Sequence, residues 1–415
     1  MSAPDDVPEV PLLTEPSDGV PDAITSTAEL AQLIERVRAG TGPVALDAER
    51  ASGYRYSQRA YLVQLRREGT GTALIDPIAV PDLSGLDAAI GDAEWILHAA
   101  SQDLPCLAEV GLHPRRLFDS ELAGRLLGAE RVALGTMVEQ YLGVRLEKGH
   151  SAADWSTRPL PHDWLVYAAL DVELLIPLRA KLVDALAETG KQQWAEQEFD
   201  AVRVASLSPP TPRAEPWRRT SGIHKIRNRR QLAAVRALWH ARDEYAAERD
   251  IAPGRILPDS AIIEAARVEP KRPAELAALP IYSGGRQRRQ LGRWFEALEG
   301  ARHVADAELP EINAAVGDGI PPTGRWRERD PDAAERLGHC RGAVAALAAE
   351  HQVLAQNLLA SDVVRRVAWQ AFEDLSETTV AARLGELGAR PWQVELCAAP
   401  LAAALRDAAT EAAAE

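Results

Sequence analysis

Apolar and polar positions alternate along the first half of the chain with two different periods. Short apolar runs at 44–49, 61–65, 73–76 and 94–98 have the length and composition of β-strands. Between and after them, apolar residues recur three and four positions apart, which is the period of an amphipathic helix. Three strands with short connections, followed by alternating helices and strands, predict an α/β domain with a mixed sheet and flanking helices.

Beyond residue 206 the strand period is lost and only the helical period remains. A proline-rich segment at 206–212 separates the two halves, because proline blocks the continuation of both helix and sheet. The pattern at 256–260 recurs at 358–362, and each copy follows a long amphipathic segment. We infer two copies of one small all-α module.

These patterns predict the division of the chain into domains. The first residues are rich in Pro, Asp and Glu without apolar periodicity, which is typical of a disordered segment. The predicted parts are a disordered acidic tail at 1–22, an α/β domain at 23–206, a linker at 207–214, a helical bundle at 215–302, a second linker at 303–332 and a second bundle at 333–415.

Charge and cysteine content narrow the class of protein. The formal net charge of −14 by itself argues against a nucleic-acid partner, but residues 213–302 hold 19 Lys and Arg against 11 Asp and Glu. Such a basic block is typical of a nucleic-acid-binding module, although solvated helix faces would give the same count. Three distant cysteines, no signal segment and no long apolar run favour a cytoplasmic protein without a membrane partner.

Two carboxylates at the end of the first predicted strand are the first candidates for chemistry. Asp47 and Glu49 are two positions apart, so in a strand their side chains lie on the same face. Two acids this close repel each other unless a cation lies between them, and hard cations such as Mg²⁺ prefer carboxylate oxygens. The alternative is a solvated strand edge.

Three further residues extend this pair. Asp103 lies at the start of a predicted helix, and Tyr167 and Asp171 are one helical turn apart on one face. Two divalent ions that clamp a phosphodiester need several carboxylates from different elements. The acids of this chain are therefore candidates for two-metal phosphoryl chemistry.

At these residues the chain resembles a known family. Segments 46–49, 98–104 and 167–172 resemble the three motifs of DEDD 3′–5′ exonucleases, the third in the variant with tyrosine (DEDDy). Segments 146–148 and 154–160 resemble a loop found in ribonuclease D and its relatives, and the helical modules resemble HRDC domains, which bind nucleic acid. An exonuclease domain followed by two HRDC-like modules is the layout of the ribonuclease D family.

The resemblance implies a ribonuclease H-like fold in the first domain and a 3′–5′ exoribonuclease. Such an enzyme releases nucleoside 5′-monophosphates from the 3′ ends of RNA and processes tRNA or other structured RNA. The resemblance also implies two divalent ions, Mg²⁺ or Mn²⁺, and a monomer. The expected metal ligands are Asp47, Glu49, Asp103 and Asp171, with Tyr167 orienting the attacking water, and the expected substrate-binding residues are His98, Lys148, Trp155, Arg286 and Arg289.

Several alternatives stay open. The substrate could be DNA, including single-stranded DNA, or the chain could be a non-catalytic RNA-binding protein that retains the site. Asp119 competes with Asp103 as the third acid, but Asp103 has His98 at the motif spacing, whereas Asp119 is placed to cap a helix. Arg50 stands where the family often has Phe, and Trp164 where it often has Gln; these departures concern the fit of the substrate rather than metal binding. Lys148 could also be a solvated lysine, Trp155 could pack its loop, and Arg286 and Arg289 could lie on an exposed helix face.

Overall fold

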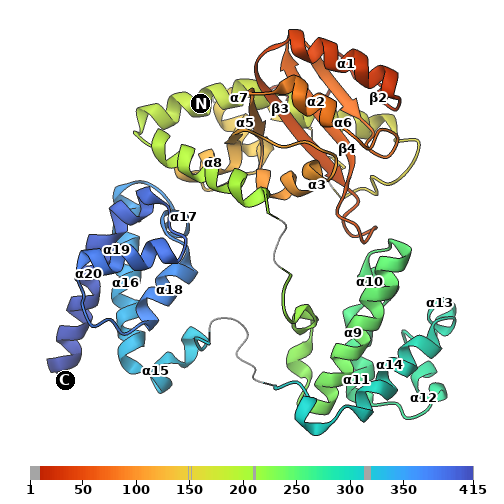
Figure 1. The fold of residues 1–415 in the computed structure, drawn as a ribbon, viewed down its shortest axis with the longest axis vertical. Helices are drawn as coiled ribbons and strands as arrows, with labels where there is room; N and C mark the ends of the chain where they lie inside the picture. Colours follow the sequence, from red (N-terminus) through yellow and green to blue (C-terminus); the bar gives the residue numbers. More distant parts are fainter. Residues whose placement is uncertain (1–9, 148, 151, 209–211, 313–318, 415) are drawn as a thin grey trace, which may run out of the picture.

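The computed structural model describes residues 10–147, 149–150, 152–208, 212–312 and 319–414. The chain forms an N-terminal domain with a β-sheet and two helical bundles (Figure 1). The mixed sheet and the helical second half predicted from the sequence are confirmed.

The central feature of the first domain is a six-stranded mixed sheet. Strands β3, β4 and β5 form an antiparallel meander, and β3, β6 and β7 run parallel to one another. The strand order is β2 (Ala23–Ile24), β5 (Gly71–Ile75), β4 (Ala60–Glu68), β3 (Thr41–Arg50), β6 (Glu94–Leu97) and β7 (Arg116–Asp119).

Both faces of the sheet are covered, and each has its own buried cluster. On one face, Leu46 and Leu65 pack with helix α1, whose buried positions Leu33 and Val37 are four residues apart. On the other face, Leu62 and the aromatic residues of a long loop pack under α6. The helices of this domain are α1 (Thr27–Ala39), α2 (Ser84–Ile90), α3 (Leu104–Glu109), α4 (Ser120–Leu126), α5 (Leu134–Leu142), α6 (His162–Glu173), α7 (Leu175–Glu188) and α8 (Gln192–Ser206).

Residues 10–22 differ from the prediction of a disordered tail. The two-residue strand β1 (Leu12–Leu13) pairs with β8 (Arg145–Leu146), and the hydroxyl of Ser17 donates to Glu173 over 2.6 Å. Asp18 forms an ion pair of 2.8 Å with Arg66. Composition alone missed this order because the contacts are to residues far away in the sequence. Residues 1–9 lie outside the described part of the chain.

The first helical bundle is built around the long helix α9. Leu232, Val235 and Leu238 of this helix lie in its core, together with Ile262 and Trp294 from later helices. The helices are α9 (Arg229–Arg249), α10 (Pro253–Ile256), α11 (Asp259–Val268), α12 (Pro273–Ala277), α13 (Gly285–Arg288) and α14 (Leu291–His303).

The second bundle repeats the order of a long helix, a one-turn helix and a further helix. Trp326, which lies in the segment predicted as a linker, is fully buried and packs on Trp369 of this bundle. The helices are α15 (Trp326–Arg329), α16 (Pro331–Glu350), α17 (Ala355–Leu358), α18 (Ser361–Trp369), α19 (Glu377–Glu386) and α20 (Pro391–Ala414).

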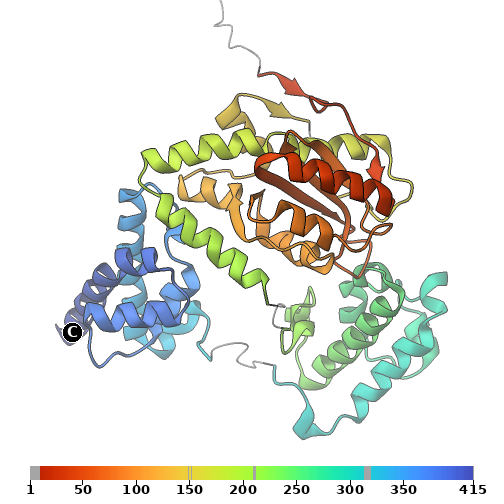
Figure 2. The same cartoon turned by 45° about the horizontal axis from the view of Figure 1, so that its top comes forward.

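Each bundle contacts the first domain at a different place. The second bundle docks on α8, where the Trp194 and Trp392 rings stack with centroids 4.5 Å apart. The first bundle contacts the loop between β3 and β4, which reaches toward α10 in both views (Figure 1, Figure 2). Among the described residues, no helix combines the length and the apolar character needed to cross a bilayer.

Candidate active site

Strand β3 carries the first two acids of the site. The three residues before Asp47 are fully buried, and the strand runs between β4 and β6 in the interior of the sheet. The side chains of Asp47 and Glu49 leave the strand on the same face because they are two positions apart. In the ladder, Asp47 lies opposite Gln64, and Glu49 lies opposite Leu62.

Helix α6 supplies the third acid and the phenol. It packs against β3, β4 and β5, with Ala168 and Ala169 fully buried. Because these side chains are short, the helix lies close to the sheet. Tyr167 and Asp171 are one turn apart on this helix, and the Tyr167 phenol interacts electrostatically with the Asp171 carboxylate.

The acids converge in space. One carboxylate oxygen each from Asp47, Glu49 and Asp171 lie within 4.8 Å of one another. The buried carboxylate of Asp103 interacts electrostatically with Asp47 and Asp171. Asp103 also lies 3.7 Å from the guanidinium of Arg50, one of the two residues that depart from the pattern of the family it resembles. The structure therefore brings together the four acids and the tyrosine that the sequence singled out.

Asp119 holds the segment that presents Asp103. Its carboxylate accepts hydrogen bonds from the backbone N–H groups of Ala99, at 3.2 Å, and Ala100, at 2.8 Å. Ala99 has a φ of 60°, a left-handed conformation that an alanine rarely adopts. Asp119 also caps α4, as predicted, by accepting from Glu121 and Leu122 N–H. Its position next to Ala99 was not predictable from spacing.

Burial and mutual repulsion raise the pKa values of the acids. Burial is the largest cause of the shift for each acid. The pKa of Asp47 is raised to about 6, that of Asp103 to about 8 and that of Glu49 to about 10. The neighbouring carboxylates add to the shift for Asp103 and Glu49, whereas the positive charge of Arg50 opposes it. The pKa of Asp171 is also raised, by burial and then by Asp47. Such a cluster favours the binding of cations.

The Tyr167 phenol stays protonated at neutral pH. Burial, followed by the charges of Asp171 and Glu49, raises the pKa of Tyr167 above its usual value. A protonated phenol can donate a hydrogen bond but cannot remove a proton from water. Tyr167 is therefore suited to orienting a water rather than to acting as a base.

The donor set fits hard divalent cations. The converging ligand atoms are carboxylate oxygens, without cysteine or histidine among them. Oxygen-only sites suit Mg²⁺ and Mn²⁺ better than softer metals. The residues present are thus compatible with the two ions expected from the sequence.

Gln64 was missed by the sequence analysis. It is fully buried, and neither polar atom of its side-chain amide has a partner within the described residues. Directly opposite residues of an antiparallel pair have side chains on the same face, so Gln64 lies beside Asp47. A lone glutamine in an apolar strand, as in 61–65, was the only signal of this residue in the sequence.

Trp155 packs the loop, which agrees with the alternative considered for it. It is fully buried, and its ring lies 5.3 Å from Trp164 and 6.4 Å from Tyr167. The loop is attached to the sheet by Arg158, whose guanidinium binds Asp76 at 2.7 Å. The burial of Trp155 argues against stacking on a base, and a supporting role behind Tyr167 is the better interpretation.

Of the remaining predicted substrate-binding residues, those that the structure describes lie outside the carboxylate cluster. The Nδ1 of His98 lies 2.9 Å from the Ser120 hydroxyl, which in turn donates to the carbonyl of Leu97. Arg286 and Arg289 are exposed residues of the first bundle. Lys148 lies outside the described residues. The roles of these residues in binding stay predictions.

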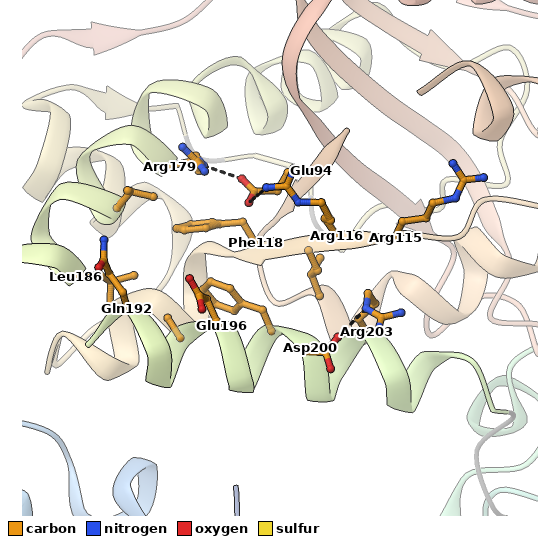
Figure 3. Close-up of a pocket in the computed structure, with 14 residues that line it drawn as sticks. Glu94, Arg115, Arg116, Phe118, Arg179, Leu186, Gln192, Glu196, Asp200 and Arg203 are labelled. Atoms are coloured by element: carbon orange, nitrogen blue, oxygen red, sulfur yellow. Dashed lines mark hydrogen bonds and ion pairs between the residues drawn. The ribbon is translucent and has the colours of Figure 1, made fainter. Parts of the chain in front are cut away.

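A separate pocket of about 450 Å³ lies between β7, α7 and α8 (Figure 3). Glu94 and Arg116, the first residues of β6 and β7, line it, whereas the acids lie near the other end of these strands. Figure 3 shows Arg179 facing Glu94, with which it pairs at 2.8 Å, and Arg203 pairs with Asp200. This pocket is therefore distinct from the carboxylate cluster.

Three family models match the chain. Residues 21–187 match the model described as 3′-5′ exonuclease, residues 231–298 match the HRDC domain, and residues 319–405 match the model described as 3′ to 5′ exonuclease C-terminal domain. The three matches follow the order of the sheet domain and the two bundles.

Two curated relatives agree with these matches. Ribonuclease D of Zymomonas mobilis is 32% identical over 333 residues, which cover 76% of this chain and 84% of that protein. Ribonuclease D of Escherichia coli is 34% identical over 295 residues, which cover 69% of this chain and 76% of that protein.

Two crystal structures extend the likeness to the fold. A protein from Bifidobacterium adolescentis has a TM-score of 0.88 at 38% identity and covers 96% of this chain and 100% of its own. Escherichia coli RNase D is described as an exoribonuclease involved in structured RNA processing. It has a TM-score of 0.68 at 27% identity, and the match covers 93% of this chain and 98% of its own. The chain therefore belongs to the ribonuclease D family of 3′–5′ exonucleases.

Proposed function

We propose that this protein is a metal-dependent exoribonuclease that removes nucleoside 5′-monophosphates one at a time from RNA 3′ ends. The observation that carries the proposal is the approach of Asp47, Glu49 and Asp171 within 4.8 Å, beside Asp103 and Tyr167. The Escherichia coli relative is described as acting in structured RNA processing. The proposed substrates are therefore tRNA or other structured RNA precursors.

The acids divide into two sets of metal ligands in this proposal. Asp47, Glu49 and Asp171 would hold one divalent ion, and Asp47 and Asp103 would hold a second. When bound, two such ions lower the pKa of a water and neutralise charge on the phosphate. The mutual repulsion of the ionised carboxylates supports this assignment, because a divalent cation between them would relieve it.

Tyr167 is proposed to orient the attacking water. Its phenol keeps its proton, because burial and the adjacent carboxylates raise its pKa. Its ring lies against the buried Trp155, with 6.4 Å between the ring centroids, and its phenol lies near the Asp171 carboxylate. A hydrogen bond from a fixed phenol restricts the direction of attack, which lowers the entropic cost of the reaction.

RNA is the proposed partner because the first bundle carries an excess of positive charge within an acidic chain. The match of residues 231–298 to the HRDC domain, a nucleic-acid-binding module, supports the same assignment. RNA and DNA differ at the sugar 2′-hydroxyl, which a protein can use to tell them apart. RNA and DNA therefore have to be compared directly.

The test is a nuclease assay with RNA labelled at its 3′-terminal nucleotide, with Mg²⁺ or Mn²⁺ and with a chelator. We expect labelled mononucleotide from the wild type with metal, and none with the chelator or from Asp47→Ala. RNA binding without release of mononucleotide by the wild type would contradict the enzyme assignment. Faster hydrolysis of the matched DNA strand would replace RNA by DNA as the substrate.

A further inference from the structure

A pocket in the first bundle is lined by three arginines. It has a volume of about 350 Å³ and lies between the C-terminal part of α9, helix α10 and helix α13. Arg249, Arg286 and Arg289 line it, together with Tyr245 and Trp294. The volume falls within the range of small-ligand sites in proteins.

The charges of this pocket have no acidic partner in the part of the chain that the structure describes. Within the described parts of the chain, no carboxylate forms an ion pair with Arg249, Arg286 or Arg289, and no acidic residue lines the pocket. Elsewhere in the bundle arginines are paired, as in Arg242 with Asp259 at 2.6 Å and Arg230 with Asp306 at 2.6 Å. Three guanidinium groups around one concavity attract an anion.

The pocket is built on a fixed framework. The side chain of Gln287 is buried, donates to the carbonyl of Ile256 and accepts a hydrogen bond of 3.0 Å from the indole of Trp294. These bonds tie α13 to α10 and α14, so the arginines on either side of Gln287 are carried by an anchored turn. Arg249 lies over the ring of Tyr245, with 5.5 Å to its centroid. An anchored framework reduces the entropy lost when an anion binds.

The same elements contact the loop that follows the catalytic strand. Asp250, next to Arg249, accepts a hydrogen bond of 2.8 Å from the backbone N–H of Ser57. The N–H of Ala252 donates to the carbonyl of Tyr54 over 3.0 Å, and Arg255 donates to the carbonyl of Gly53 over 2.7 Å. Residues 51–59 connect β3, which carries Asp47 and Glu49, to β4. Hydrogen bonds thus connect the elements that form the pocket to the loop after the strand that carries Asp47 and Glu49.

We propose that this arginine pocket, defined by Arg249, Arg286 and Arg289, binds a backbone phosphate of the RNA strand upstream of the nucleotide being removed. The inference rests on the proposed exoribonuclease function and adds a second point of attachment for the substrate. Arginine binds phosphate oxygens through two parallel N–H groups, which suits a phosphodiester that must be held in a fixed place. Long RNA then gains affinity from this pocket, and a dinucleotide does not.

The experiment compares the double variant Arg286→Ala/Arg289→Ala with the control Arg288→Ala, an exposed arginine on the same helix that does not line the pocket. Binding of a long single-stranded RNA is measured by fluorescence anisotropy in an Asp47→Asn background, so that the RNA stays intact. We expect the double variant to lose about tenfold in affinity, and the control to keep its affinity. The slope of log affinity against log salt should fall by about 0.7 for each lost phosphate contact.

Hydrolysis is measured with the catalytic site intact. The double variant should show a higher KM for long RNA and unchanged hydrolysis of a dinucleotide. Equal affinity of the double variant and the control for long RNA would overturn the inference, as would equal losses on RNA and dinucleotide. The inference would also be overturned if the double variant kept its affinity for RNA but lost binding of inorganic phosphate or of an acidic protein. If the wild type hydrolyses nothing, the proposed function fails, and the anisotropy result still decides the inference.

Discussion

At the scale of single residues, buried polar groups mark the reaction centre. Asp103 and Glu49 are among the few buried acids of the first domain, and Gln64 beside Asp47 is a fully buried amide without a partner in the described structure. Leaving such a group unpaired costs about 1–3 kcal/mol, so its presence needs a reason. A hydrogen bond to Asp47 or to a water of the metal-loaded site would provide one.

Gln64→Leu tests this interpretation. In metal-free protein we expect the variant to be more stable by about 1 kcal/mol, because an unpaired amide is replaced by an apolar side chain. Hydrolysis of RNA should fall about tenfold, and the concentration of Mn²⁺ needed for half-maximal activity should rise. Thermal unfolding with and without Mn²⁺ measures the first effect, and metal titration of the activity measures the second. A less stable metal-free variant with normal metal affinity would mean that Gln64 is only a packing residue.

His98 makes stability depend on pH. Burial lowers the pKa of His98 to about 4, whereas the ordinary value is 6.5. As the pH falls below about 6.5, the unfolded chain binds a proton that the folded protein does not, so the contribution to stability is lost between these two values. His98→Gln should flatten this loss, by at most about 1.4 kcal/mol per pH unit.

The measurement is the urea midpoint at pH 7 and at pH 5. His113→Gln, which removes an exposed histidine of the same domain, is the matched control. We expect the midpoint at pH 5, relative to that at pH 7, to be higher in His98→Gln than in the wild type, and to be unchanged in His113→Gln. An unchanged difference between the midpoints in His98→Gln would show that the pKa of His98 is the same in the folded and the unfolded protein.

At the scale of elements, the site depends on how strands and helices place side chains that are far apart in the sequence. Strand β3 and helix α6 each present two residues to one region, because the periods of strand and helix put those residues on one face. Asp103 is presented differently, by an irregular turn that Asp119 stabilises. This turn is the part of the site that depends most on a single neighbour.

Asp119→Asn should therefore impair the site from a distance. An amide has one acceptor atom where the carboxylate has two. Either the N–H of Ala100, bound to Oδ2, or the N–H groups of Ala99 and of the start of α4, bound to Oδ1, therefore lose their partner. We expect a loss of about 1–3 kcal/mol in stability and at least about a tenfold loss of activity at low Mn²⁺, partly restored at high Mn²⁺. Asp87→Ala, which removes the carboxylate that accepts from the backbone N–H of His113, is the control for stability alone.

At the scale of the whole molecule, the two bundles have different relations to the first domain. The second bundle is fixed to α8, where Trp392 also donates to Glu198 over 3.1 Å and Arg390 lies 3.5 Å from the same carboxylate. The first bundle contacts the loop after β3 through Asp250, Ala252 and Arg255. One bundle thus braces the domain, and the other lies beside the residues that are proposed to act on RNA.

Trp194→Ala tests the bracing role. It removes one ring of the stack with Trp392, at an expected cost of about 1–3 kcal/mol to docking. We expect calorimetry to resolve a separate unfolding transition for the second bundle, and small-angle scattering to report a larger radius of gyration. Hydrolysis of a dinucleotide should remain. Trp239→Ala, in the first bundle, is the control, and an unchanged single transition in Trp194→Ala would contradict the bracing role.

Much of this protein follows from local pattern. The strands around Asp47, the helix with Tyr167 and Asp171, the proline-rich boundary and the helical modules were predictable, because periodicity and proline act within a few residues. The candidate acids could also be selected, because their spacing matches the motifs of a known family. What they do in the reaction remains a proposal.

The tertiary structure decided what depends on residues far apart in the chain. It placed β3 between β4 and β6 and so brought Asp47 and Asp103 to one region, and it set the amide of Gln64 beside Asp47. It also packed residues 10–22 on the first domain, buried Trp155 and left the arginine pocket without an acidic side chain among the described residues that line it. Burial and electrostatic interaction act between neighbours in space, and the pattern of residues along the sequence does not identify those neighbours.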